Sequence, residues 1–223
     1  MRFAAAALLA LLAVQDATAQ ALPGIDGNAR RPIPLNDPPW RILGRVQTDL
    51  GARCTGFLVA PRVVETAAHC LFIRKTGHFT PPGHVHFLLG YRAGTYRAHA
   101  HVQRLVIPAG YNPIAPTTTP LDDHALLVLD RSLISESQLL PFVKPAVGMR
   151  AALAGYQQDR AEIAVGDTDC AIVRITGKLV AHNCSGTFGV SGAPLIVRAS
   201  QGWAIAGVTT LAHAGYGGYA IAQ

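Results

Sequence analysis

The chain has 223 residues, of which 50% are hydrophobic and 14% are charged, and its formal net charge is +6 at pH 7. This length and apolar content fit one compact folded unit that buries about 70% of its unfolded surface. The 22 glycines and 15 prolines favour many tight turns over long helices. The basic residues are scattered along the chain, which argues against a nucleic-acid partner because nucleic-acid grooves concentrate their basic residues on one face.

The first segment has the pattern of a signal peptide. Arg2 precedes an apolar run over residues 4–14, and small residues at 17–19 allow cleavage after Ala19, with Ala21 as a second choice. The run is too short to span a membrane, and no later stretch is apolar enough to do so. We therefore predict a signal peptide over residues 1–19 and an exported protein, secreted or periplasmic, without stable membrane insertion.

Residues 20–41 are rich in proline, glycine and polar groups, which predicts a flexible leader or pro-segment that is not packed. The chain then becomes strand-like. In its first half, short β-prone runs cover residues 55–60, 62–67, 85–90, 95–107 and 123–130. The run over 95–107 alternates between apolar and polar residues, as a half-buried strand does. Residues 108–121 hold four prolines and are expected to form a surface loop.

The second half has the same character. Strands are predicted over residues 150–154, 170–175, 178–181, 194–197, 203–208 and 218–221, and no helix longer than two turns is expected. Several short strands separated by turn residues indicate an all-β chain of two antiparallel β-barrels. We place the first barrel over residues 42–138 and the second over residues 139–223.

The chain contains four cysteines, and in an exported protein these favour disulfides. Four cysteines allow three pairings, of which Cys54 with Cys70 and Cys170 with Cys184 is the simplest. Each pair would close a loop of about 15 residues and contribute about 3 kcal/mol of stability. The alternative is a zinc site, which is disfavoured because there is no C-x-x-C pair.

Three segments carry the functional signal. Thr-Ala-Ala-His-Cys occupies residues 66–70, Asp-His-Ala-Leu-Leu residues 123–127, and Gly-Val-Ser-Gly-Ala-Pro residues 189–194. In this order they resemble the motifs of the chymotrypsin-like serine proteases, and the segment over 39–46 resembles the bacterial branch related to glutamyl endopeptidases. The resemblance implies two Greek-key barrels with the active site in the cleft between them, and it matches Cys54–Cys70 to the family's histidine-loop disulfide. Family members often end in a C-terminal helix, which we expect to be absent here.

The resemblance implies the catalytic roles. A serine hydroxyl needs a neighbouring base, so Ser191 would be the nucleophile, His69 the general base, and Asp123 the carboxylate that orients the imidazole. The competing Asp122 is out of register with the Ala-Leu-Leu that follows. The backbone N–H groups of Gly189 and Ser191 would form the oxyanion hole. No cofactor or metal is expected, and the partner is a protein or peptide substrate bound by a monomer.

Two residues depart from the family pattern. Val190 stands where activatable members carry an aspartate that pairs with a new N-terminal ammonium, so we expect activity without a free amino group at Ile42. Glu65 stands where a large apolar residue is usual. A buried unpaired carboxylate is costly, so Glu65 is expected to face outward or to meet a cation such as an arginine.

Cleavage specificity is less defined by the sequence. Ser185 falls at the floor of the primary pocket and Thr209 at the position where glutamyl-specific relatives use histidine. Neither supports a basic or glutamyl preference, which leaves a small or apolar residue before the cleaved bond. The histidine pairs at 84/86 and 99/101 have strand spacing and could chelate a metal, although solvent-facing positions are the simpler interpretation.

Two other functions remain open. A pseudoprotease, a binding protein on the same fold, is the main alternative, and Glu65 and Val190 are the features that favour it. An esterase of the α/β-hydrolase type is disfavoured, because its Gly-x-Ser-x-Gly elbow is interrupted here by Ala193 and Pro194.

Overall fold

The computed structural model describes residues 22–24, 30–213 and 217–223. The signal peptide expected over residues 1–19 lies outside these ranges. Within them the regular structure consists of β-strands and short 3-10 helices, the longest of which, Ala68–Leu71, has 4 residues. None of the described helices has the length and apolar character needed to cross a membrane.

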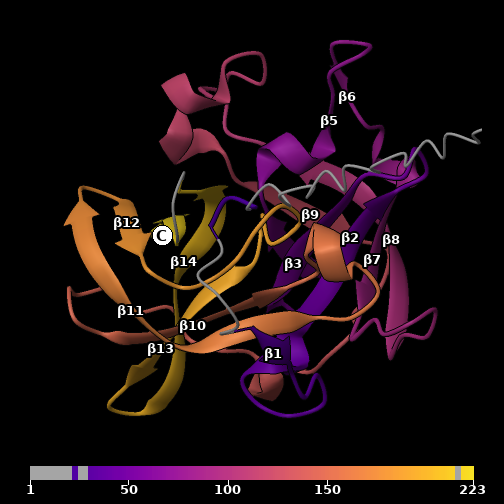
Figure 1. Cartoon of the computed structure of the whole chain (residues 1–223). Coiled ribbons are helices and arrows are strands. Elements are labelled where there is room, and N and C mark those ends of the chain that lie inside the picture. Colours follow the sequence, from indigo (N-terminus) through magenta and orange to yellow (C-terminus); the bar gives the residue numbers. More distant parts are fainter. Residues whose placement is uncertain (1–21, 25–29, 214–216) are drawn as a thin grey trace, which may run out of the picture.

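The first half of the chain forms a closed antiparallel barrel with the strand order β2-β3-β4-β9-β8-β7. Alternate residues point into the barrel: Val85, Phe87 and Leu89 on β7 are fully buried, whereas His86 between them is not. Pairing of β2 with β7 closes the barrel. Its strands are β2 (Leu43–Thr48), β3 (Arg53–Ala60), β4 (Val63–Thr66), β7 (Val85–Leu89), β8 (Ala98–Val106) and β9 (Ala125–Leu129). The hairpin of β5 (Phe72–Ile73) and β6 (His78–Phe79) projects from it (Figure 1).

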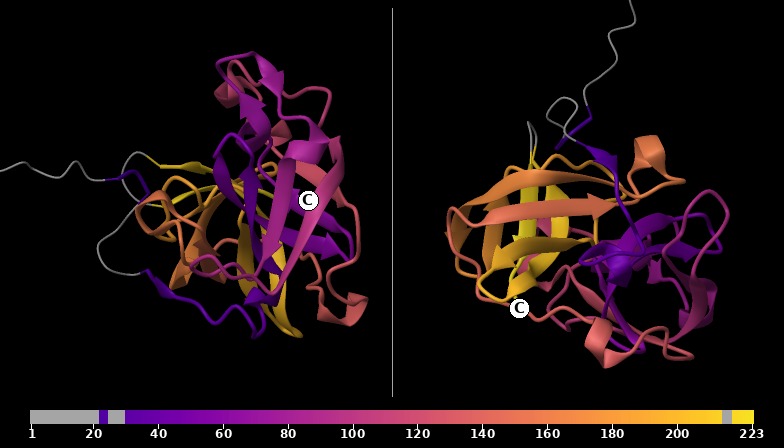
Figure 2. Two further views of the ribbon diagram at one scale, coloured as in Figure 1. Left: turned by 90° about the vertical axis from the view of Figure 1, so that its right-hand side faces the viewer. Right: turned by 90° about the horizontal axis from the view of Figure 1, so that it is seen from below.

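The second half repeats this connection order. The sheet β11-β10-β13-β14-β15-β12 is closed by a further pairing of β11 with β12, so strands one to six of each barrel are joined in the same Greek-key sequence. Figure 2 shows the two barrels side by side. The second comprises β10 (Arg150–Gly155), β11 (Val165–Thr176), β12 (Leu179–His182), β13 (Pro194–Ala199), β14 (Gly202–Ala212) and β15 (Gly218–Ile221).

The predicted all-β, two-barrel fold is therefore confirmed. The described chain ends with β15 and two further residues, and no α-helix occurs in the described ranges. The short helices, each of three or four residues, are η1 (Trp40–Ile42), η2 (Ala68–Leu71), η3 (Pro82–His84), η4 (Pro116–Thr118), η5 (Pro120–Asp122), η6 (Glu136–Gln138) and η7 (Gln158–Arg160).

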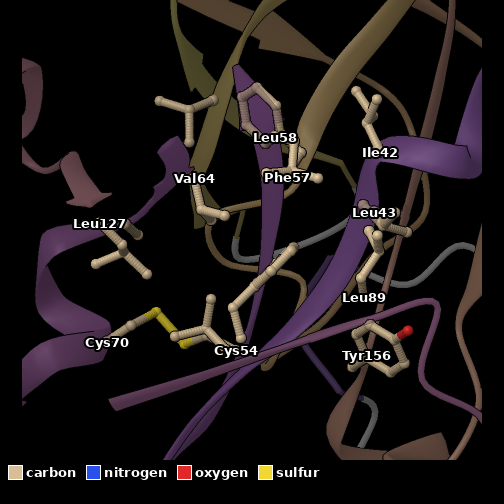
Figure 3. Packing of buried hydrophobic residues seen from close by; sticks show 14 of the residues in the cluster. Ile42, Leu43, Cys54, Phe57, Leu58, Val64, Cys70, Leu89, Leu127 and Tyr156 are labelled. Atoms are coloured by element: carbon tan, nitrogen blue, oxygen red, sulfur yellow. A yellow bond between two sulfur atoms is a disulfide. The ribbon is translucent and has the colours of Figure 1, made fainter. Parts of the chain in front are cut away.

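The core of the first barrel extends into the seam between the barrels. Phe57, Leu58 and Leu127 fill the barrel, and Tyr156 from the second half joins the same buried cluster (Figure 3). The Tyr156 hydroxyl donates a hydrogen bond of 2.9 Å to the carbonyl of Tyr91. This contact helps to fix the two barrels relative to each other, and the predicted catalytic residues come from both.

Part of the expected leader is packed. Arg31–Pro32 forms β1, which pairs with the first residues of β11. Ile33 and Trp40 are only 5% and 4% exposed, so this segment buries apolar surface that a free leader would leave in water. The expectation of a flexible leader is therefore wrong for residues 30–41.

Both predicted disulfides are present, and no cysteine is free. Cys54–Cys70 joins β3 to η2, the helix that carries His69. Cys170–Cys184 joins β11 to the segment that precedes the Ser191 loop. Each disulfide thus tethers a segment next to a predicted catalytic residue.

Candidate active site

His69 and Asp123 meet through two hydrogen bonds. His69 lies on η2 after β4, and Asp123 lies between η5 and β9. His69 Nδ1 is 2.7 Å from one Asp123 carboxylate oxygen, and the His69 backbone N–H donates to the other at 2.9 Å. A carboxylate held at both oxygens fixes the orientation of the imidazole and leaves Nε2 free for chemistry.

Asp123 is buried, whereas His69 is partly open to solvent. The Asp123 side chain is 2% exposed and that of His69 is 31% exposed. Burial, together with the nearby Asp123 carboxylate, raises the pKa of Tyr111 well above its usual range, so this phenol stays neutral beside the carboxylate.

Ser191 reaches the same pocket from the second barrel. His69, Asp123, Ser191 and Thr209 are among the residues that line a cavity of about 480 Å³. Among the described residues, no hydrogen bond joins the Ser191 hydroxyl to His69, a contact that is often loose in enzymes without substrate. The structure thus brings all three predicted catalytic residues to one cavity.

The backbone of the Ser191 loop is tightly constrained. Gly189 has a φ of +90°, and a Cβ there would lie 2.3 Å from the Tyr156 carbonyl oxygen. The carbonyl of Phe188 accepts a 2.7 Å hydrogen bond from the Gln158 N–H. Because the two polar groups of a planar trans peptide point in opposite directions, this bond turns the Gly189 N–H away from Gln158.

Thr55 is a supporting residue that the sequence did not reveal. Its hydroxyl donates to the Gly189 carbonyl at 2.8 Å and accepts from the Tyr156 N–H at 2.9 Å. Its own N–H donates to the Ser191 carbonyl at 3.0 Å. A fully buried residue of the first barrel thus holds the serine loop of the second at two points. A lone threonine in a strand carries no sequence signal for such a role.

Gln157 and Arg30 support the neighbouring part of this loop. The fully buried Gln157 accepts a hydrogen bond of 2.9 Å from the Thr187 N–H and another of 2.7 Å from Arg30. Arg30 also binds both carboxylate oxygens of Asp159, at 2.9 and 2.8 Å. The packed leader segment is therefore linked to the loop that precedes Ser191.

The two predicted pocket residues have different positions. Thr209 lines the cavity and is 2% exposed. Ser185 is fully buried, does not line the cavity, and its N–H donates to Asp167 at 2.9 Å. The place of Ser185 at the floor of the pocket stays a prediction. Three cavity-lining threonines have buried hydroxyls without a hydrogen-bond partner among the described residues, namely Thr187, Thr209 and Thr210.

Leader residues also enter this region. Pro23 lines the cavity beside His69 and Ser191. The Gly24 carbonyl accepts hydrogen bonds from the Gly186 N–H at 2.7 Å and the Gly217 N–H at 3.4 Å. A Cβ on Gly24 would lie 2.0 Å from the Gly186 carbonyl oxygen, so only glycine fits this position.

Glu65 and Val190 are both buried. Glu65 is 2% exposed, accepts a hydrogen bond from the Gln223 amide, and lies 3.6 Å from His124 Nδ1. Glu65 therefore does not face outward, and the ionisable side chain beside it is a histidine in place of the arginine given as the example of a cation. Val190 is 4% exposed and packs in the apolar core of the second barrel, and Ile42 is fully buried at the end of η1.

Comparisons with known proteins agree with this geometry. No curated protein sequence matches the chain. A solved structure titled "Structure of Glu endopeptidase in complex with MPD" superposes with a TM-score of 0.74 at 18% identity, covering 89% of this chain and 92% of that chain, which shows a shared fold. The family model described as Trypsin matches residues 28–222. The chain therefore belongs to the trypsin family and is a serine-type endopeptidase.

Proposed function

We propose that this protein is an exported endopeptidase that forms an acyl-enzyme on Ser191, with His69 as general base and Asp123 as the orienting carboxylate. The observation that carries this proposal is the two-point hydrogen bonding of Asp123 to His69 beside a cavity that Ser191 also lines. Two disulfides support export, because disulfides persist in oxidising compartments.

The steps follow from these positions. Ser191 Oγ attacks the peptide carbonyl while its proton passes to His69 Nε2, and Asp123 stabilises the imidazolium. His69 then returns that proton to the leaving amine as the carbon–nitrogen bond breaks. A water molecule then gives a proton to His69 as its oxygen attacks the acyl carbon. The bond from that carbon to Ser191 Oγ breaks, and His69 returns the proton to Oγ, which releases the acid and regenerates the enzyme.

The oxyanion hole would use the N–H groups of Gly189 and Ser191. The hydrogen bond from Gln158 to the Phe188 carbonyl supports the required orientation of the Gly189 N–H. Thr55 and Gln157 hold the same loop, and Val190 packs in the core where activatable relatives place an aspartate. Activity should therefore not require a free ammonium at Ile42.

The lining of the cavity gives no sign of a charged substrate side chain. Thr187, Thr209 and Thr210 line it, but their hydroxyl oxygens are buried and do not face the cavity. Their hydroxyls therefore cannot bind a substrate side chain, and a small or apolar residue before the cleaved bond remains the preference that we propose.

The first test is labelling of the purified protein with a fluorophosphonate probe, beside Ser191→Ala. Labelling of the wild type alone is expected, because the probe requires an activated serine and a formed oxyanion hole. Absence of labelling, with or without residues 20–24, would contradict the proposal and favour a binding protein. A peptide library then compares alanine, valine and leucine with glutamine, glutamate and arginine before the cleaved bond, and a preference for the first group is the expected result.

A further inference from the structure

Three histidines meet on the outer face of the first barrel. His86 lies on β7, and His99 and His101 lie on β8, at the edge of the molecule away from the second barrel (Figure 1). The strand register sets His86 directly opposite His101. His99, two residues before His101, shares this face because side chains alternate along a strand. Phe87 and Ala100 between them are fully buried and point inward.

The nitrogen atoms of these imidazoles have the spacing of metal ligands. One ring nitrogen from each histidine lies within 4.8 Å of the others, and His86 Nδ1 is 3.1 Å from His99 Nε2. Zinc–nitrogen bonds of about 2.0–2.1 Å in tetrahedral geometry place two ligand nitrogens about 3.3–3.4 Å apart. Small side-chain rotations would therefore suffice to bring all three nitrogens to one ion.

Asp49 gives His86 the arrangement of a metal ligand. Its carboxylate lies 2.6 Å from His86 Nε2 and 2.7 Å from His84 Nδ1. An imidazole that donates its Nε2–H to a carboxylate carries its lone pair on Nδ1, the nitrogen that faces His99. Histidine ligands of metal ions commonly have such a carboxylate partner, which fixes the tautomer and raises the basicity of the ligating nitrogen.

We propose that His86, His99 and His101 form a binding site for a divalent transition-metal ion, with Zn²⁺ as its natural occupant, and that Asp49 is the outer partner of His86. The fourth ligand is water, because no fourth protein ligand lies in this cluster within the described residues. Imidazole is a ligand that Zn²⁺, Cu²⁺ and Ni²⁺ all accept.

The ion would connect β7, β8 and, through Asp49, the turn between β2 and β3. Binding to the folded state alone raises the thermal midpoint by mass action. The site lies on the outer barrel face, so its function is stabilisation of the first barrel and it takes no part in the reaction.

The test uses the full chain with Ser191→Ala, which prevents self-digestion, after removal of metals with EDTA. Calorimetric titration with ZnCl₂ should give one ion per chain, and Co²⁺ should give the visible absorption of a tetrahedral site. His99→Gln and His101→Gln should weaken binding at least tenfold, and Asp49→Asn about 10- to 100-fold. Zn²⁺ should raise the thermal midpoint of the reference protein but not of His99→Gln.

Two controls separate this site from others. His78→Gln changes an exposed histidine on β6 outside the cluster and should leave binding unchanged. His69→Gln reports any Zn²⁺ held at the catalytic pair. Binding that survives both His99→Gln and His101→Gln, or that is lost only with His69→Gln, overturns the proposal, as does the absence of binding. If His99→Gln does not fold in EDTA, the test rests on His101→Gln. The His101 side chain is exposed, so its replacement should leave the fold intact.

Discussion

At the scale of single residues, only glycine suits position 189, because of both its backbone conformation and the atoms around it. Its φ of +90° is unfavourable for other residues, and a Cβ would meet the Tyr156 carbonyl oxygen at 2.3 Å. Gly189→Ala should therefore displace the oxyanion N–H and reduce kcat/KM by about 10²–10³-fold. The measurement is ester hydrolysis, with the thermal midpoint recorded in parallel.

Gly177→Ala is the matched control for this change. Gly177 also has a positive φ, +60°, but a Cβ there would meet nothing within 4 Å. The Gly177→Ala variant should lose some stability through backbone strain and keep its activity. Equal activity losses in the two variants would mean that backbone strain, and not the oxyanion hole, explains the effect.

Thr55 provides a second prediction for a single residue. Thr55→Val keeps the shape of the side chain but leaves the Gly189 carbonyl and the Tyr156 N–H without their partner. We expect kcat to fall by about tenfold, since a buried unsatisfied group costs about 1–3 kcal/mol, while KM changes little. Thr55→Ser retains the hydroxyl and should restore kcat in steady-state assays. No rescue by serine would assign the loss to packing alone.

At the scale of elements, the leader consists of two parts with opposite effects. Pro23 and Gly24 occupy the substrate cavity and its wall, so removal of residues 20–24 should increase the rate of fluorophosphonate labelling. If the cavity is free in about a tenth of the molecules, the increase is about tenfold. Gly24→Ala should have the same effect, because its Cβ cannot fit beside Gly186. Unchanged rates in both variants would show that the segment does not block the cavity.

The following part of the leader should instead be required. Arg30 supports Gln157, which holds the Thr187 N–H, and it also binds Asp159. Arg30→Ala should lower the labelling rate in the protein that lacks residues 20–24, because the Ser191 loop loses a support. Asp159→Asn tests the ion pair separately and should have the smaller effect, since the described hydrogen bonds of the Asp159 carboxylate go to Arg30 and not to Gln157 or Thr187. A labelling rate unaffected by Arg30→Ala would contradict this role.

At the scale of the whole molecule, a buried histidine makes stability depend on pH. His182 on β12 is 3% exposed, and neither ring nitrogen has a hydrogen-bond partner among the described residues. Burial lowers the pKa of His182 from 6.5 to about 4. Between these values the unfolded chain binds a proton that the folded chain does not, so the free energy of unfolding falls as the pH drops from 6.5 toward 4.

Urea unfolding of the Ser191→Ala protein at pH 7.5 and pH 5 measures this dependence. His182→Leu removes the titrating group and should reduce the difference between the two pH values. Ion pairs such as Arg30 with Asp159 lower the pKa of the carboxyl group, so the stability they contribute is lost mainly at lower pH. These carboxylates are present in both proteins and do not account for a difference between them. An identical pH dependence in the two proteins would exclude His182 as its cause.

The sequence by itself predicted most of the strands and the motifs that identify the family, whereas the catalytic roles of His69, Asp123 and Ser191 stay predictions. Runs of β-prone residues predicted the strand of residues 218–221 with its observed bounds, and most other strands to within a few residues, because strand propensity depends on the local residues. It gave no separate strand for β2 over residues 43–48, and it did not indicate β1, β5 or β6, which have two residues each. The Greek-key topology was expected from the family resemblance and not from the strand pattern, since one pattern of apolar residues is compatible with many strand orders.

Only the tertiary structure decided which residues support the site. Thr55 and Arg30 bind partners more than 100 residues away along the chain, and Gln157 holds Thr187, which is 30 residues away. No local pattern marks such contacts. The same holds for Glu65, whose partners His124 and Gln223 come from distant segments. The local sequence predicts the strands and the residue types of the three motifs, because both depend on neighbouring residues. Packing between the barrels depends instead on where distant segments meet in space.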